Sequence, residues 1–188
     1  LIDYARRIDG LQRFVFASTS EVYAGTLKHF DLTVPTPESV PLALTDLREP
    51  RTSYMLSKIY GEALCLQSGL PATIVRPHNI YGPRMGMSHV IPELLQRSWK
   101  ATEGETLDVY SVEHRRSFCY IDDAVEMLIR MARSESCKGK VLNLGRQGPE
   151  LTMLEVAKTV LQVQEKTLRI NPLPPTPGSP SRRAPDVR

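Results

Sequence analysis

The sequence is poor in the features that mark membrane, nucleic-acid-binding and metal proteins. No apolar run reaches the roughly 18 residues that a membrane-spanning helix needs. The 24 basic and 21 acidic residues nearly balance, without a long basic block, which argues against nucleic acid as a partner. The four histidines lack the spacing of metal ligands. We therefore expect a protein that works without a metal, a membrane or a nucleic acid.

Cysteine is scarce as well. The three cysteines are Cys65, Cys119 and Cys137, an odd number with no CxxC pair. This pattern predicts free, mostly buried thiols in a reducing cytoplasm. The hydrophobic content of 41% over 188 residues is enough for one domain with a substantial core, or for parts of two.

Two short apolar runs flank one amphipathic helix. The runs "FVFA" (14–17) and "PATIV" (71–75) have the form of strands buried on both faces of a parallel sheet. Between them, a helix is predicted from Thr52 or Ser53, as N-cap residues, to Gly69. Strand, helix and strand in this order predict a right-handed crossover and an α/β fold with a parallel sheet.

Weaker signals place the other elements. They predict a helix over 1–7 that Gly10 ends, a long loop over 25–51, and a helix over "AVEMLIRMA" that Asp122 and Asp123 cap. They also predict a strand at "KVLNLG" and a helix over "MLEVAKTVLQV" with a capping box from Thr152 and Glu155. From 171 the proline-rich tail should be extended or loose.

Hydroxyl and charged side chains follow both central strands. Ser18 to Glu21 come directly after the first strand and "RPHNIYGPR" (76–84) after the second, at the sheet edge where α/β proteins bind ligands. Tyr54 and Lys58 lie four residues apart on one face of the helix between them. A nearby ammonium lowers the pKa of a phenol and makes it a usable base. The YxxxK spacing is weak evidence alone, but its place in the fold strengthens it.

Six segments together resemble the extended short-chain dehydrogenase/reductase family of NAD-dependent nucleotide-sugar epimerases, dehydratases and decarboxylases. They are "FVFASTSEVYA", "SYMLSK", "IVRPHNIYGPR", "RRSFCYIDDAVEML", "VLNLG" and "RRAPDV". The resemblance implies a Rossmann-like doubly wound parallel sheet over 1–84 and a smaller C-terminal α/β domain for the substrate over 85–188, with 117–133 packing back on the first domain. The glycine-rich GxxGxxG turn of the family is absent. We therefore expect the N-terminal part of the Rossmann domain, and a stretch after "APDVR", to be missing here.

The resemblance also assigns roles to individual residues. The implied catalytic residues are Thr19, Tyr54, Lys58 and Glu21. The implied NAD-binding residues are Ser18, Tyr54, Lys58, Pro77 and His78. The implied substrate-binding residues are Ser20, Asn79, Val109, Arg116 and Arg183. They would hold a nucleotide-diphosphate sugar, and the family leads us to expect uridine as its nucleoside. The resemblance also implies that the enzyme forms a homodimer.

Three residues in or near the expected site can also be interpreted as structural residues. Asn79 can shape a turn before Gly82, Val109 can belong to the core, and Arg76 can be the partner in a structural ion pair.

The residues leave three functions open. We favour an epimerase that works through a transient 4-keto sugar. The segment "ASTSEVY" is closer to the UDP-glucuronate decarboxylases and to some 4,6-dehydratases, although dehydratases of the dTDP-glucose type have Asp in place of Ser20. The third possibility is a sugar-nucleotide-binding protein without turnover. Glu21 separates the first two, since only a decarboxylase or dehydratase needs it after the oxidation.

Overall fold

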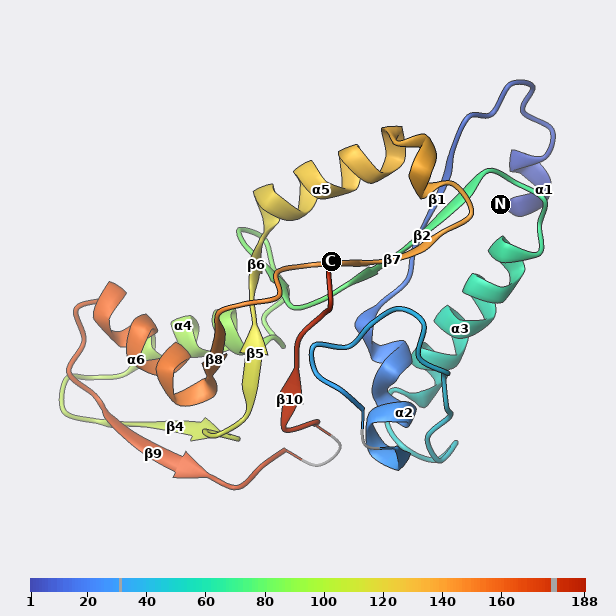
Figure 1. The fold of residues 1–188 in the computed structure, drawn as a ribbon. Helices are drawn as coiled ribbons and strands as arrows, with labels where there is room; N and C mark the ends of the chain where they lie inside the picture. Colours follow the sequence, from blue (N-terminus) through green and yellow to red (C-terminus); the bar gives the residue numbers. More distant parts are fainter. Residues whose placement is uncertain (31, 177–178) are drawn as a thin grey trace.

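The computed structural model describes residues 1–30, 32–176 and 179–188, which form an α/β fold (Figure 1). The helices are α1 (Ile2–Ala5), the 3-10 helix η1 (Ser20–Tyr23), α2 (Ala24–His29), α3 (Thr52–Leu66), α4 (Val90–Lys100), α5 (Ile121–Arg133), the 3-10 helix η2 (Glu135–Cys137) and α6 (Met153–Val163). The strands are β1 (Phe14–Ala17), β2 (Ala72–Pro77), β3 (Ile80–Tyr81), β4 (Thr106–Tyr110), β5 (Arg115–Ser117), β6 (Cys119–Tyr120), β7 (Val141–Leu144), β8 (Glu150–Thr152), β9 (Arg169–Leu173) and β10 (Arg182–Arg183).

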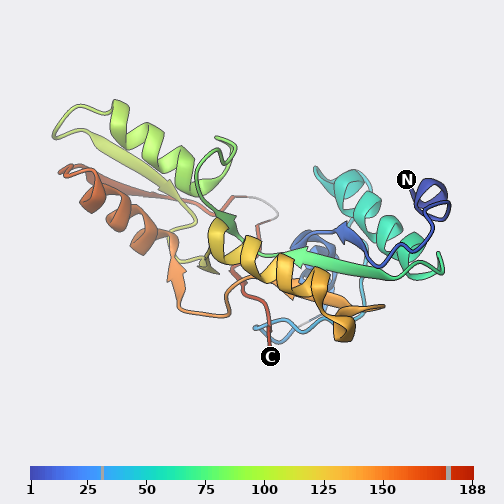
Figure 2. The same ribbon diagram turned by 90° about the horizontal axis from the view of Figure 1, so that it is seen from above.

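A parallel sheet of order β1-β2-β7 supports the N-terminal part of the fold. Alternate residues of its central strand, β2, face opposite sides. Ile74 packs with Cys65 of α3 on one side, and Val75 packs with Ala124 of α5 on the other. The two views show these helices on opposite faces of the sheet (Figures 1 and 2). The predicted strand–helix–strand crossover and Rossmann-like parallel sheet are confirmed.

A second core lies among the later elements. The paired strands β4 and β9 pack with α4 and α6 around Leu94, Leu107 and Ala157. Beside them, β5 pairs in parallel with β10 and antiparallel with β8. The predicted capping box is confirmed, since Thr152 and Glu155 bond reciprocally at the start of α6. The end of the chain thus returns to the middle of the molecule through β10.

Two expectations about single elements are wrong. The predicted loop over 25–51 contains most of α2, in which Thr26 is buried and bonds to both Pro41 O and Ala43 N. Asp122 and Asp123 lie in the first turn of α5, where they complement the helix dipole, but they do not cap it. The start of the tail is extended, one of its two predicted forms, because β9 pairs with β4 and tolerates Pro172.

The start of α3 also differs from its prediction. Its N-cap is Arg51, in the left-handed conformation with φ 76°, and not Thr52 or Ser53. Thr52 is buried instead, and its hydroxyl donates to Asp46 O. Arg51 therefore projects from the junction between the preceding loop and the helix that carries Tyr54.

The chain has no helix, within the ranges that the structure describes, that is long and apolar enough to cross a bilayer. The three cysteines are unpaired, with Cys65 and Cys119 buried and Cys137 partly so, as predicted.

Candidate active site

The hydroxyl cluster after β1 divides into buried and accessible groups. Ser18 and Ser20 are both 5% exposed, and Ser18 Oγ donates to Glu62 Oε1 of α3 at 2.5 Å. Thr19 is only partly buried; its Oγ1 accepts from Glu21 N at 3.3 Å, as the N-cap of η1. Thr19 is thus the hydroxyl of this cluster best placed to meet a ligand.

The structure brings the predicted Tyr54–Lys58 pair to the same end of the sheet. Lys58 Nζ donates to Ala17 O, the last residue of β1, at 2.8 Å. The same ammonium lies 5.7 Å from the centroid of the Tyr54 ring. Because an ammonium has three donors, its bond to Ala17 leaves capacity for further acceptors. Tyr54 is 44% exposed, so its phenol is open to a ligand.

Glu21 links two segments of the chain that are distant in the sequence. Its carboxylate pairs with Arg51 before α3, and its Oε1 lies 3.9 Å from Arg183 Nη1 of β10. Only 15% of the Glu21 side chain is exposed. The site therefore gathers a carboxylate and two guanidiniums beside Thr19.

A third guanidinium lies next to Arg183. Arg116 of β5 and Arg183 of β10 are direct partners in the parallel register. Burial, together with the charge of Arg183, lowers the pKa of Arg116 to about 10. Burial also lowers the pKa of Arg183; the charge of Arg51 adds to this, whereas Glu21 opposes it. Burial is the main cause of both shifts, so both guanidiniums are held away from water.

The Arg116 guanidinium has hydrogen-bond acceptors, whereas one nitrogen of Arg183 has none among the described residues. Arg116 donates to Pro180 O at 2.6 Å and to Ser179 Oγ at 3.0 Å. Arg183 Nε is buried without a hydrogen-bond partner among the residues that the structure describes. Arg51 and Arg183 thus face one carboxylate, Glu21, and Arg116 lies beside Arg183, so an anion would complete the balance of charge.

Two predicted ligand contacts are wrong at the level of the side chain. Val109 is 2% exposed in the second core, where it packs with apolar neighbours. His78 is 1% exposed, and its Nε2 lies 3.0 Å from Asn143 Oδ1. Neither side chain faces a ligand, because tertiary packing encloses both. Pro77, beside His78, ends β2 and is partly buried.

Asn79 has the turn-forming geometry that was its alternative interpretation. Its φ is 44°, a left-handed conformation that Asn tolerates. Its Nδ2 donates to Ser117 O at 2.9 Å and to Arg183 O at 3.5 Å. Asn79 therefore ties the end of β2 to the strands that carry Arg116 and Arg183.

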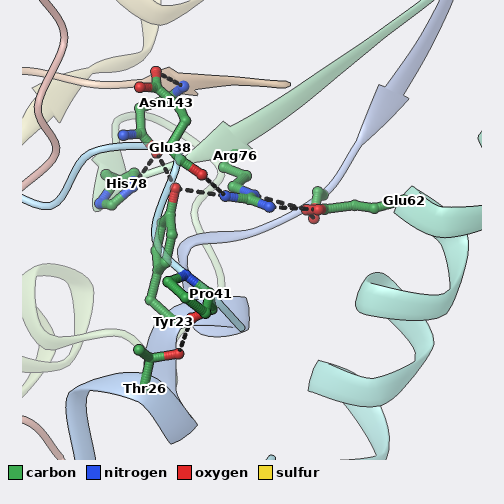
Figure 3. Close-up of polar contacts among 9 residues, drawn as sticks. Tyr23, Thr26, Glu38, Pro41, Glu62, Arg76, His78 and Asn143 are labelled. Carbon is green, nitrogen blue, oxygen red and sulfur yellow. Dashed lines mark hydrogen bonds and ion pairs between the residues drawn. The ribbon is translucent and has the colours of Figure 1, made fainter. Parts of the chain in front are cut away.

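A buried polar network beneath the site was missed by the sequence analysis, apart from Arg76. Arg76 forms the expected ion pair: Nε and Nη2 donate to the Glu62 carboxylate at 2.9 and 2.6 Å (Figure 3). Arg76 Nη1 also donates to the Tyr23 hydroxyl at 2.8 Å, which donates in turn to Asn143 at 2.9 Å. The available signal was spacing, since Tyr54, Lys58 and Glu62 recur every four residues along one helix face.

The comparison with protein families agrees with this geometry. The sequence model of the NAD dependent epimerase/dehydratase family matches residues 1–145. The chain belongs to this family.

Curated relatives and solved structures support the same assignment. The chain is 35% identical to a UDP-N-acetyl-alpha-D-glucosaminuronate decarboxylase of Bacillus cytotoxicus, over 89% of this chain and 51% of that protein. It is 32% identical to UDP-glucuronic acid decarboxylase 3 of Arabidopsis thaliana, over 100% of this chain and 53% of that protein. The chain therefore spans about half the length of these relatives.

Among solved structures, the chain resembles a UDP-galactose 4-epimerase at a TM-score of 0.75 and 26% identity, over 99% of this chain and 57% of that one. It also resembles the UDP-glucuronic acid 4-epimerase of Bacillus cereus in complex with UDP-glucuronic acid and NAD, at a TM-score of 0.75 and 23% identity, over 100% of this chain and 56% of that one. The second likeness shows the fold alone.

Proposed function

We propose that this chain supplies the catalytic and substrate-binding residues of an NAD-dependent enzyme that decarboxylates a UDP-linked uronic acid. The observation that carries the proposal is Glu21, held by Arg51 and Arg183 beside Thr19. Two guanidiniums at one carboxylate, with the Arg116 guanidinium in the strand beside them, suit a substrate with a diphosphate and a sugar carboxylate. The decarboxylase relatives support the same reaction.

The described residues fit the nicotinamide–ribose half of NAD. The half-exposed Tyr54 phenol and the spare donors of Lys58 lie at the carboxyl end of β1, where such sheets bind dinucleotides. Ser18 contributes indirectly, because its hydroxyl is committed to Glu62. When bound, NAD would supply the hydride acceptor for oxidation of the sugar.

The side chains then divide the work of proton transfer and anion binding. Tyr54, with the Lys58 ammonium beside its ring, takes the proton of the sugar 4-hydroxyl, and Thr19 holds that oxygen. Arg116 and Arg183 bind the diphosphate. Oxidation makes the sugar a β-keto acid, so its carboxylate can leave as CO2 while the electron pair moves toward the keto oxygen. Glu21 acts on the keto intermediate at this second stage, and a proton is added to the ring carbon that has lost CO2.

A 4-epimerase is the second candidate, and one observation favours it. The chain is 26% identical to a solved UDP-galactose 4-epimerase, over 99% of this chain. The substrate would then keep its carbon skeleton.

An exposed apolar surface on α3, with Tyr60 66% and Leu64 43% exposed, supports the further proposal of a homodimer through this helix.

Glu21→Gln in the full-length enzyme separates the two reactions, because it keeps the shape and removes the charge. In a decarboxylase, turnover should stall after hydride transfer, so reduced cofactor accumulates and CO2 release falls on the order of 10²–10⁴-fold. The measurement pairs cofactor absorbance with trapped CO2. Near-normal turnover of a UDP-sugar, without accumulation of reduced cofactor, would overturn the decarboxylase proposal in favour of the epimerase.

A further inference from the structure

Asn143, in β7, is the centre of a buried set of hydrogen bonds that the proposed reaction does not use. Its side-chain oxygen accepts from the Tyr23 hydroxyl at 2.9 Å and lies 3.0 Å from His78 Nε2. Its side-chain nitrogen donates to Thr36 O at 2.9 Å and to Asp186 O at 3.0 Å. An amide has two acceptor positions and two donors, so all four are occupied.

The surrounding groups fix which way this amide points. Arg76 donates to the Tyr23 hydroxyl, so that hydroxyl directs its own proton to the amide oxygen. Thr36 O and Asp186 O can only accept, so they select the amide nitrogen. Burial lowers the pKa of His78 to about 3, so the ring is neutral, and the tautomer with the proton on Nε2 fits the amide oxygen that faces it. The nitrogen side of the amide therefore faces Thr36 and Asp186 (Figure 3 shows the Tyr23, Arg76, His78 and Asn143 side).

The groups on the nitrogen side hold the last segment of the chain. Asp186 N donates to Thr36 O at 3.0 Å, and Thr36 N donates to Ala184 O at 2.9 Å. This pairing forms a short parallel bridge between Thr36 and Pro185. Asn143 is 3% exposed and bonds to both sides of the bridge.

The segment held in this way begins one residue after Arg183. On its other side, Arg183 pairs with Arg116 through β10 and β5, a strand pair of only two residues in register. So short a pairing gives little restraint by itself. Besides the bond from Asn79 to Arg183 O, the anchoring of residues 184–186 thus restrains the position of Arg183 beside Glu21.

We infer that Asn143 is a positioning residue: its amide anchors residues 184–186 and thereby holds Arg183 in the anion site. The inference rests on the proposed function, since it assigns the clamped residue to binding of the diphosphate. Asn143 touches neither that ligand nor the reacting atoms and acts through Arg183.

Asn143→Asp is the sharpest test, because it keeps an acceptor for Tyr23 and His78 but puts an oxygen against two carbonyl groups. Hydrogen exchange of the full-length protein should then speed up at the amides of Thr36 and Asp186, and not at Ser18 N, which bonds to Val75 O within the sheet. Asn143→Ala, which adds no charge, should act in the same direction if the first variant folds poorly.

Binding of UDP, followed by calorimetry, gives the second readout. Asn143→Asp should weaken it about 10–100-fold, and the double variant with Arg183→Ala should bind no more weakly than Arg183→Ala alone, because Arg183 is already misplaced. The matched control is Gln12→Glu, the same amide-to-carboxylate change at an exposed side chain, which should alter neither readout.

The outcomes separate this inference from the proposed function. Unchanged exchange at Thr36 and Asp186, or fully additive losses of UDP affinity, would overturn the role of Asn143. Unchanged UDP affinity in Arg183→Ala would instead overturn the anion site, whereas the exchange rates would still report whether Asn143 anchors the segment.

Discussion

At the scale of single residues, the site depends on side chains that differ in exposure. Tyr54 and Thr19 are accessible, whereas Ser18 and Ser20 are buried. The Lys58 ammonium bonds to Ala17 O, the last residue of β1, and lies close to the Tyr54 ring. The accessible groups therefore lie at the carboxyl end of β1, where the proposed function needs a base and a substrate-binding hydroxyl.

Replacing Tyr54 tests this arrangement directly. Tyr54→Phe removes the only group that the proposal gives for taking the first proton, so turnover should fall about 10²–10⁴-fold with little change in UDP-sugar binding. Steady-state kinetics and calorimetry on the full-length enzyme measure both. Tyr4→Phe is the control, since Tyr4 is an exposed tyrosine of α1 with no role in the proposal. Turnover within a few-fold of the original protein would rule Tyr54 out as the base.

At the scale of elements, α3 is joined to the sheet by a buried ion pair. The side chains of Glu62 and Arg76 are each 5% exposed, and their atoms approach to 2.6 Å. Ser18 donates to the same carboxylate from the end of β1. One carboxylate thus connects the helix that carries Tyr54 with both neighbouring strands.

The stability of this pair should depend strongly on which partner is removed. Glu62→Leu leaves the Arg76 charge buried and unpaired, and should lower the free energy of unfolding by about 3–5 kcal/mol. Adding Arg76→Met removes that charge and should recover most of the loss. Urea unfolding of the single and double variants measures this.

The control is Glu126→Leu in α5. Glu126 pairs with Arg130 on an exposed helix surface, where a pair contributes less than about 1 kcal/mol. Equal losses for Glu62→Leu and Glu126→Leu would contradict the role of the buried pair.

At the scale of the whole molecule, the two cores are joined by segments that are distant in sequence. β10 returns from the C-terminal region to β5, and residues 184–186 continue toward β7 (Figure 1). His78 lies at this junction, in contact with Asn143 and close to Tyr23. Protonation of His78 would therefore disturb the region where both parts of the fold meet.

This burial predicts a pH dependence of stability. The pKa of His78 is about 3 in the folded protein, below its ordinary value of 6.5, so the unfolded chain binds the proton more tightly. The free energy of unfolding should therefore fall as the pH drops through 6.5 toward 3, by about 2 kcal/mol between pH 7 and pH 5. Urea unfolding at several pH values measures it.

The variant His78→Phe should reduce the slope of this dependence, although the lost bond to Asn143 lowers stability at every pH. His114 contributes with the same sign, because burial also lowers its pKa. An identical slope in His78→Phe would show that His78 is not the group responsible.

Local patterns in the sequence were enough for the sheet, the α3 crossover and the family. Short apolar runs separated by an amphipathic helix have few other solutions, and the capping box at Thr152 and Glu155 depends only on neighbours in the chain. The positions of Thr19, Tyr54 and Lys58 at one end of the sheet also follow from local order, because parallel strands bring their carboxyl ends to the same edge.

Only the tertiary structure decided which polar residues face a ligand and which hold the fold together. His78 and Asn79 are neighbours in one motif, yet packing buries the first, and the second bonds to the backbone of β5 and β10. Asn143 looked like an ordinary strand residue, because its partners at Tyr23, Thr36 and Asp186 are 120, 107 and 43 positions away in the chain. Contacts of this range leave no periodicity in the sequence, since they form only when the whole chain has folded.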